Sequence, residues 1–165
     1  MKKVLLLIIS VLFAIQANAQ TQEEAPAVTI DSLSTKLTEL QHNYDFLYCD
    51  YQLHKVKTNF EQLSQDIQII NNELTIKIYF GQYNRDLYII YSEDYDTKCK
   101  NYNAFKRQFE VVQELVTINI ITTGFTESEL NVFNACIETI ESAIKTVEAA
   151  LKYYDACLKI YKDEN

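Results

Sequence analysis

Glycine and proline are nearly absent from this sequence, which has two glycines and one proline among its 165 residues. Turn-rich β sandwiches and barrels depend on these residues at their turns, so the composition argues against such folds. Phosphate-binding loops also need several glycines at fixed spacing, and the chain has too few to build one. Leucine, isoleucine, glutamate, lysine and glutamine are abundant instead, and they favour long helices.

Motifs of catalysis and metal binding are missing as well. The sequence contains no G-x-S-x-G elbow, no H-E-x-x-H motif and no C-x-x-C pair. The two histidines, His42 and His54, are far from the spacing of metal ligands. We therefore expect a protein that is not an enzyme and that has no cofactor and no metal site.

Long apolar runs are absent except near the N-terminus. Lys2 and Lys3 precede an apolar stretch of about 12 residues, whereas a membrane-spanning helix needs ~20. A small-residue Ala-Asn-Ala site follows at residues 17–19, before Gln20. The basic start, short apolar core and small-residue ending predict a cleavable signal peptide over residues 1–19. The protein is then exported, to the periplasm or the medium, without a membrane span.

Positive charge is scarce, because 15 lysines and arginines face 23 aspartates and glutamates, giving a net charge of −8. Such a surface repels nucleic acid and anionic headgroups, so no nucleic-acid partner is expected. The same acidity also keeps an exported protein soluble, and it therefore identifies no partner by itself.

The rest of the chain divides at its glycines. Residues 20–30 are expected to form a flexible leader, and residues 31–165 one domain that is long enough to bury a core. Gly81 and Gly124 cut this domain into three segments of similar length, and short connections between long helices require antiparallel neighbours. The sequence predicts an all-α fold, an elongated antiparallel three-helix bundle with coiled-coil-like heptad packing, over residues 31–80, 82–123 and 125–165.

The segment 125–165 has the clearest helical pattern. Its apolar residues recur at alternating steps of three and four, as in a helix that packs along its whole length. Gly124 can end the preceding helix in the left-handed conformation, and Thr126 with Glu129 matches a T-x-x-E capping box. The heptad positions are Leu130, Phe133, Ile137, Ile140, Ile144, Val147, Leu151, Tyr154, Leu158 and Tyr161.

The segment 31–80 begins at a cap, Asp31 or Ser32, and follows a heptad pattern whose phase shifts after Tyr51. We expect this stutter to unwind or bend the helix between Tyr51 and Val56. The positions before the shift are Leu33, Leu37, Leu40, Tyr44, Leu47 and Tyr51. The positions after it are Leu53, Val56, Phe60, Leu63, Ile67 and Ile70.

The segment 82–123 is more aromatic, and Asn84 is its expected cap. Its apolar positions are Tyr88, Tyr91, Tyr95, Cys99, Tyr102, Phe109, Val112 and Val116. Two stretches also fit short strands. In residues 74–80 apolar side chains occupy every second position, and residues 116–123 are rich in β-branched side chains. The helical interpretation is favoured because each stretch continues a helical pattern. If the first helix ended early, it would end at Asn71.

Four cysteines in an exported chain favour disulfides. Cys136 and Cys157 lie 21 residues apart on one helix, or ~31 Å, whereas bridged Cα atoms lie within ~7 Å. In the folded-over chain, residue i of the first helix lies beside about residue i + 85 of the third, so Cys49 faces Cys136. We predict a Cys49–Cys136 disulfide, and a Cys99–Cys157 disulfide if the register shifts or a helix is shorter. The alternative is that all four pack as free thiols.

In the same register, many tyrosines lie close together at one end of the bundle. This end contains the connection near Gly81 and the C-terminus. Tyrosine combines a rigid apolar ring with a polar tip, which suits protein recognition and sugar stacking. The alternative is that tyrosines line the margins of a narrow bundle, with the ring inside and the hydroxyl in water. The candidate binding residues are Tyr79, Tyr83, Tyr88, Tyr91, Tyr95, Tyr153, Tyr154 and Tyr161, while Tyr44, Tyr48 and Tyr51 gather toward the other end.

The export signal, its ending before Gln20 and the nonapeptide LYCDYQLHK at residues 47–55 resemble uncharacterised small exported helical proteins of Bacteroides-type bacteria. This resemblance implies export and no known activity. A rigid scaffold without a reactive constellation predicts a non-enzymatic protein that binds another protein, as an envelope adaptor, inhibitor or chaperone. The alternative is a carrier of an apolar or carbohydrate ligand at the tyrosine-rich end. An exposed heptad face would equally support a homodimer.

Overall fold

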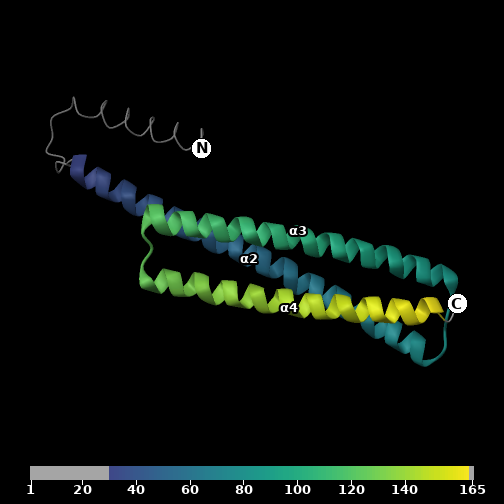
Figure 1. The fold of residues 1–165 in the computed structure, drawn as a ribbon. Helices are drawn as coiled ribbons and strands as arrows, with labels where there is room; N and C mark the ends of the chain where they lie inside the picture. The colour runs from purple at the N-terminus through teal and green to yellow at the C-terminus, as the bar shows by residue number, and fades with distance from the viewer. Residues whose placement is uncertain (1–29, 164–165) are drawn as a thin grey trace, which may run out of the picture. The chain divides into compact units, whose positions relative to one another are not determined.

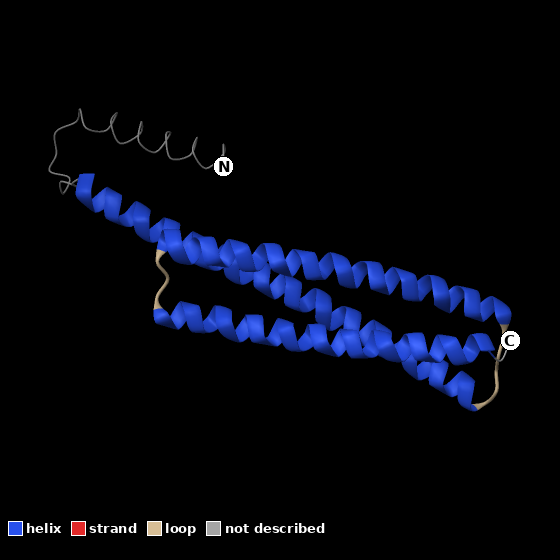
Figure 2. Ribbon diagram, viewed as in Figure 1, coloured by secondary structure: helices blue, strands red, loops and turns tan. Residues whose placement is uncertain are grey.

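The computed structural model describes residues 30–163, which form three α-helices and no strand. In chain order the helices are α2 (Ile30–Tyr79), α3 (Arg85–Thr123) and α4 (Glu127–Asp163) (Figure 1). Two short loops join them (Figure 2). The helical bundle is thus confirmed, and both stretches that also fitted strands are helical. The predicted signal peptide, residues 1–19, lies outside the described residues.

Contacts divide the chain into two compact units, Met1–Thr38 and Glu39–Asn165. The described part of the first unit is the start of α2, where the Thr35 hydroxyl donates to the Asp31 carbonyl at 2.9 Å. Asp31 lies within the first turn of α2, so the helix begins ahead of the expected cap at Asp31 or Ser32. All packing between helices described below lies within the second unit.

The ends of α3 and α4 follow the local signals of the sequence. The Asn84 side chain accepts the Asp86 N–H at 2.8 Å and caps α3, and Gly124 at φ 72° ends it in the left-handed conformation. The Thr126 N–H donates to Glu129 Oε2 at 2.8 Å, and the Glu129 N–H donates to Thr126 Oγ1 at 3.3 Å. The predicted cap, helix end and capping box are all confirmed.

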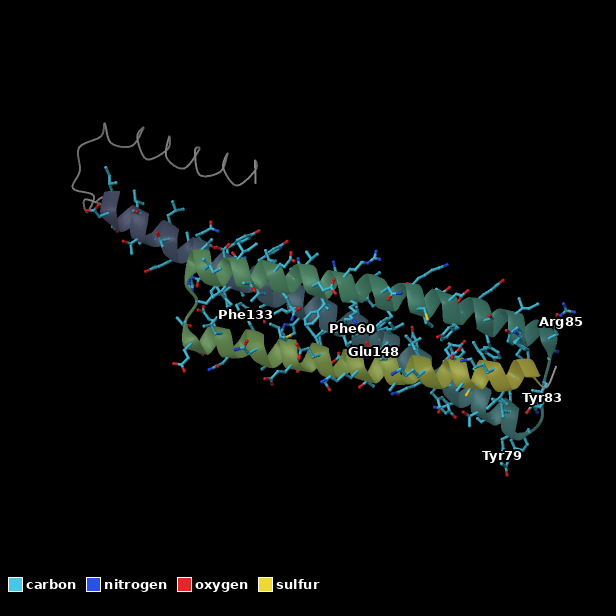
Figure 3. The ribbon with its side chains drawn as sticks, in the orientation of Figure 1. Phe60, Tyr79, Tyr83, Arg85, Phe133 and Glu148 are labelled. Atoms are coloured by element: carbon cyan, nitrogen blue, oxygen red, sulfur yellow. The ribbon has the colours of Figure 1, made fainter. Side chains whose placement is uncertain are left out.

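Most residues at the predicted heptad positions of α4 are buried and line one side of the core. Phe133 and, from α2, Phe60 point between the helices (Figure 3). The predicted positions of α4 that are buried are Phe133, Ile140, Val147, Leu151, Tyr154, Leu158 and Tyr161. From α3 the core receives Tyr91, Phe109, Val112 and Val116. Each fully buried side chain of this size contributes about 1.5–3 kcal/mol.

The pattern of α2 differs from the prediction, because its two halves lie on opposite faces of one continuous helix. Tyr51 is 60% exposed, whereas Leu53 is 0% exposed. Two residues along a helix rotate by about 200°, so the phase shift moves the pattern to the other side. Ahead of the shift, the core is reached instead by Cys49 and by Phe46, whose ring lies 5.3 Å from that of Phe133.

Polar contacts show that α2 is inclined to α4. His42 Nε2 lies 3.0 Å from Glu129 Oε1, a separation of 87 residues along the chain. Asn71 Nδ2 donates to the Ala150 carbonyl at 3.0 Å, across 79 residues. The offset therefore agrees with the expected value of about 85 residues near His42 and falls below it near Asn71. The helix also continues past Asn71 to Tyr79, as the favoured helical interpretation predicts.

Candidate functional site

An open groove of about 370 Å³ lies between α2 and α3. Its floor is apolar, with Val112 buried and Leu115 half-buried, and its rim carries amide and guanidinium groups. The residues that line it are Tyr48 and Gln52 from α2, and Arg107, Gln108, Val111, Val112 and Leu115 from α3. The groove therefore combines an apolar base with polar groups at its edge.

Two hydrogen bonds hold the walls of this groove in place. The Thr123 hydroxyl donates to Asp45 Oδ2 at 2.9 Å near the end of α3. Farther along, Asn59 Nδ2 donates to Gln108 Oε1 at 3.2 Å. Both bonds join α3 to α2, so the groove is part of the packed bundle and does not depend on a loop.

Arg107 is exposed at the rim and forms no ion pair or hydrogen bond with any residue in 30–163. The guanidinium of Arg107 is therefore available to a group of another molecule. Its planar fork can bind a carboxylate in bidentate fashion. Val111, beside it, is 64% exposed. The groove can thus receive an apolar group and an acidic group side by side.

A row of exposed large side chains runs along α2 next to this groove. We call Leu40, Tyr44, Leu47 and Tyr51 the outer seam; they are 66, 61, 63 and 60% exposed. Their spacing of four, three and four residues places them on one helical face. The Tyr44 ring stacks on that of Tyr48, with centroids 6.0 Å apart and an interplanar angle of 6°. The outer seam therefore adjoins the groove wall.

The structure brings several tyrosines of the predicted binding cluster together, but mainly inside the bundle. The Tyr161 ring contacts those of Tyr83 at 5.4 Å and Tyr91 at 6.2 Å, and Tyr95 contacts Tyr154 at 5.3 Å. Tyr154 and Tyr161 are 0% exposed, and Tyr91 is 7% exposed. These three rings fill the core and leave almost no surface for a ligand.

The hydroxyl groups of the buried tyrosines are bonded within the protein. Tyr154 donates to the Tyr91 carbonyl at 3.0 Å, Tyr91 to Glu73 at 2.5 Å and Tyr161 to the Gln82 carbonyl at 2.7 Å. Burial, together with neighbouring carboxylates, raises the pKa of Tyr91 and of Tyr154. Both phenols stay protonated and serve as internal hydrogen-bond donors.

The other predicted tyrosines are less buried. Tyr79 is 82% exposed at the end of α2 and points away from the bundle (Figure 3). Tyr153 is 48% exposed, and its hydroxyl lies 2.8 Å from Thr75 Oγ1. Tyr88 packs half-buried against the core. Of the eight predicted binding residues, only Tyr79 is thus more than half exposed to solvent.

All four cysteines are free thiols, so the structure lacks the predicted Cys49–Cys136 and Cys99–Cys157 disulfides. Cys49 and Cys136 are both buried in the core, and no bond joins them. Cys49 meets α3 instead, where Asn119 Nδ2 lies 3.5 Å from its sulfur. Burial raises the pKa of Cys49, Cys136 and Cys157, and protonated thiols are poor nucleophiles and metal ligands.

The two histidines bind neighbouring groups. His42 contacts Glu129, and His54 Nδ1 lies 3.0 Å from the Asp50 carbonyl. Among residues 30–163, no three His, Cys, Asp or Glu side chains are placed to hold a metal ion. No helix in the described part of the chain is both long and apolar enough to cross a membrane.

No protein-family model, curated protein sequence or solved structure matches this chain. The resemblance to exported helical proteins of Bacteroides-type bacteria therefore stays a prediction. Functional inference depends on the groove and the outer seam. Our sequence reasoning missed the groove because Arg107 and Val111 lie outside the heptad pattern. The adjacent valines Val111 and Val112 were a usable signal, since two consecutive helical residues do not share one narrow face.

Proposed function

We propose that this protein is a non-enzymatic, exported helical-bundle protein that binds another protein at the groove between α2 and α3. An envelope adaptor, inhibitor or chaperone would act in this way. The observation that carries the proposal is the unpaired Arg107 at the rim of an apolar groove. Arginine and aromatic side chains dominate the energy of protein interfaces, and the groove offers Arg107 beside Tyr48.

The chemistry of the groove favours a polypeptide segment with a large apolar side chain next to a carboxylate. The apolar side chain would cover Val112 and Leu115, and the carboxylate would bind Arg107. The side-chain amides of Gln52 and Gln108 at the edge can bond backbone groups of the segment. An open groove encloses little of a small molecule, whereas bound small ligands are usually 70–90% buried, which favours a protein partner.

A small-molecule carrier was the alternative, with its ligand at the tyrosine-rich end. Close packing there counts against it, because Tyr154 and Tyr161 have no exposed surface and Tyr91 almost none. Their hydroxyls are bonded to protein groups. A ligand at this end would have to displace core side chains.

We also propose that the bundle is antiparallel with coiled-coil-like packing, as the spacing of its apolar residues predicts. Contacts between α2 and α3 support opposite directions, since Asp45 meets Thr123 while Glu73 meets Tyr91. The heptad spacing of the buried residues in α2 and α4 supports coiled-coil-like packing. Export remains our proposal from residues 1–19, and it would place the groove in the periplasm or the medium.

Site-specific photo-crosslinking in the native host tests the groove. A photoreactive phenylalanine analogue at Val111 should crosslink one other protein, and the same analogue at Ile90 should not. Ile90 is a matched control because it is 57% exposed on the same helix and does not line the groove. Arg107→Glu should abolish the crosslink at position 111 by reversing the charge at the rim. Equal crosslinking at both positions, or none at Val111, would contradict the proposal.

A further inference from the structure

We propose that the outer seam is a homodimer interface, in which α2 of one copy packs against α2 of a second copy. The outer seam faces away from the core of its own bundle, and its four side chains are each at least 60% exposed. Exposed apolar patches of this kind mark interaction surfaces in soluble proteins. The outer seam adjoins the groove wall but shares no residue with the lining of the groove.

The order of residues in the outer seam is self-complementary. Leucine and tyrosine alternate as Leu40, Tyr44, Leu47 and Tyr51. With a two-fold axis midway between Tyr44 and Leu47, Tyr44 faces Leu47 of the second copy and Leu40 faces its Tyr51. Every layer then contains one leucine and one tyrosine, so all layers have the same volume. A two-fold dimer requires this kind of surface, which complements itself.

Charge does not oppose this contact, although the chain as a whole is acidic. None of the four side chains in the outer seam is ionisable near neutral pH. Asp50 flanks the seam and already contacts His54, with 3.2 Å between Oδ1 and Nδ1. In the same two-fold register, Asp50 lies nearest Asn43 of the second copy, because these two residues share one flank of the seam. The register therefore places no two carboxylates opposite each other across the seam.

The exposed area is close to the minimum for a specific dimer. With about 200 Å² for each fully exposed large side chain, the outer seam offers about 500 Å² per copy. Two copies would bury about 1,000 Å², the lower limit for a biological interface. We therefore expect a dimer that dissociates on dilution.

Sedimentation velocity of the purified full-length exported chain over a wide concentration range tests the dimer. The wild type should shift from monomer to dimer as concentration rises. Leu47→Glu should weaken dimerisation by about tenfold or more, because it places two charges in the apolar seam. Ile69→Glu is the matched control, since Ile69 is 66% exposed on the same face of the same helix, about five turns beyond the outer seam. Circular dichroism should show both variants folded.

Three outcomes would overturn the homodimer. The wild type could stay monomeric at every concentration, Leu47→Glu could dimerise as tightly as wild type, or Ile69→Glu could weaken the dimer equally. None of these affects crosslinking at Val111, so failure of the homodimer and failure of the groove proposal are separable. A dimer that Leu47→Glu weakens and Ile69→Glu preserves would support the outer seam.

Discussion

Single polar groups in the core join neighbouring helices of the bundle. The Tyr154 hydroxyl, on α4, reaches the Tyr91 carbonyl and Asp94 Oδ2 on α3. Asn71, on α2, donates to the Ala150 carbonyl on α4, while its own Oδ1 has no hydrogen-bond partner. A buried polar residue of this kind costs stability, but it can specify how two helices pair. At the residue scale, tyrosine and asparagine therefore direct packing in this protein.

Replacement of Tyr154 by phenylalanine measures one such bond. Tyr154→Phe should reduce the free energy of unfolding by about 1–2 kcal/mol, because it removes both hydrogen bonds and leaves Asp94 less satisfied. Urea denaturation followed by circular dichroism gives the value. Tyr79→Phe is the control and should change stability by less than about 0.5 kcal/mol, since Tyr79 is 82% exposed. Equal effects of the two substitutions would contradict the internal role of Tyr154.

At the element scale, α2 carries apolar side chains on two opposite faces. Its inner face buries Leu53, Val56 and Phe60 in the core, and its outer face exposes the outer seam to solvent. Within a single three-helix bundle, the other two helices cover only one side of such a helix. The apolar residues on its other side therefore stay in contact with solvent. The exposed side then remains open for a second molecule.

Alanine substitutions on the two faces of α2 should have unequal effects. Phe60→Ala should destabilise the protein by about 3–5 kcal/mol, because Phe60 is fully buried and its loss leaves a cavity. Leu47→Ala, on the 63% exposed Leu47, should change monomer stability by less than about 0.5 kcal/mol. Thermal unfolding of dilute protein compares them. A large loss for Leu47→Ala would instead place the outer seam in the monomer's own core.

The start of α4 gives the protein a pH-sensitive element. Hydrogen bonds from the Thr126 N–H and hydroxyl, with a smaller effect of His42, hold the pKa of Glu129 below its ordinary value of 4.5. Since the pKa is lower in the folded state, this contribution to stability is complete above the ordinary pKa. It is lost as the pH falls through the lower, folded value.

Glu129→Gln should therefore reduce the loss of unfolding free energy at acid pH. Glutamine keeps the geometry of the capping box but does not titrate. Urea unfolding between about pH 6 and pH 3 should show a smaller loss of stability for the variant than for wild type. Glu127→Gln, in the same first turn, is the control and should retain the wild-type slope. Parallel curves for Glu129→Gln and wild type would rule out this role for the capping box.

At the scale of the whole molecule, all four cysteines are free thiols. Alkylation of the unfolded, unreduced protein should label all four cysteines. In the native state Cys99 should react first, because it is half-buried whereas Cys49, Cys136 and Cys157 are buried with raised pKa values. Mass spectrometry with peptide mapping follows the labelling. Fewer than four labels on the unfolded chain would reveal a disulfide.

The sequence by itself determined the elements of this protein, because their signals are local. Asn84 and Gly124 mark the two ends of α3, the Thr126 capping box starts α4, and the heptad pattern of α4 selects its buried face. Each signal depends on backbone hydrogen bonds or periodicity within a few turns, so it can be read without the rest of the fold.

Only the tertiary structure decided which face of α2 is buried and how α2 lies against α4. The α2 pattern is apolar both before and after its phase shift at Tyr51. Periodicity alone does not indicate which of the two faces the other helices cover. The inclination of α2 to α4 arises from the packing of three helices together, and it changes the register between them from one end of the contact to the other. The groove beside Arg107 and the exposed outer seam follow from the same long-range packing, which no local stretch of sequence encodes.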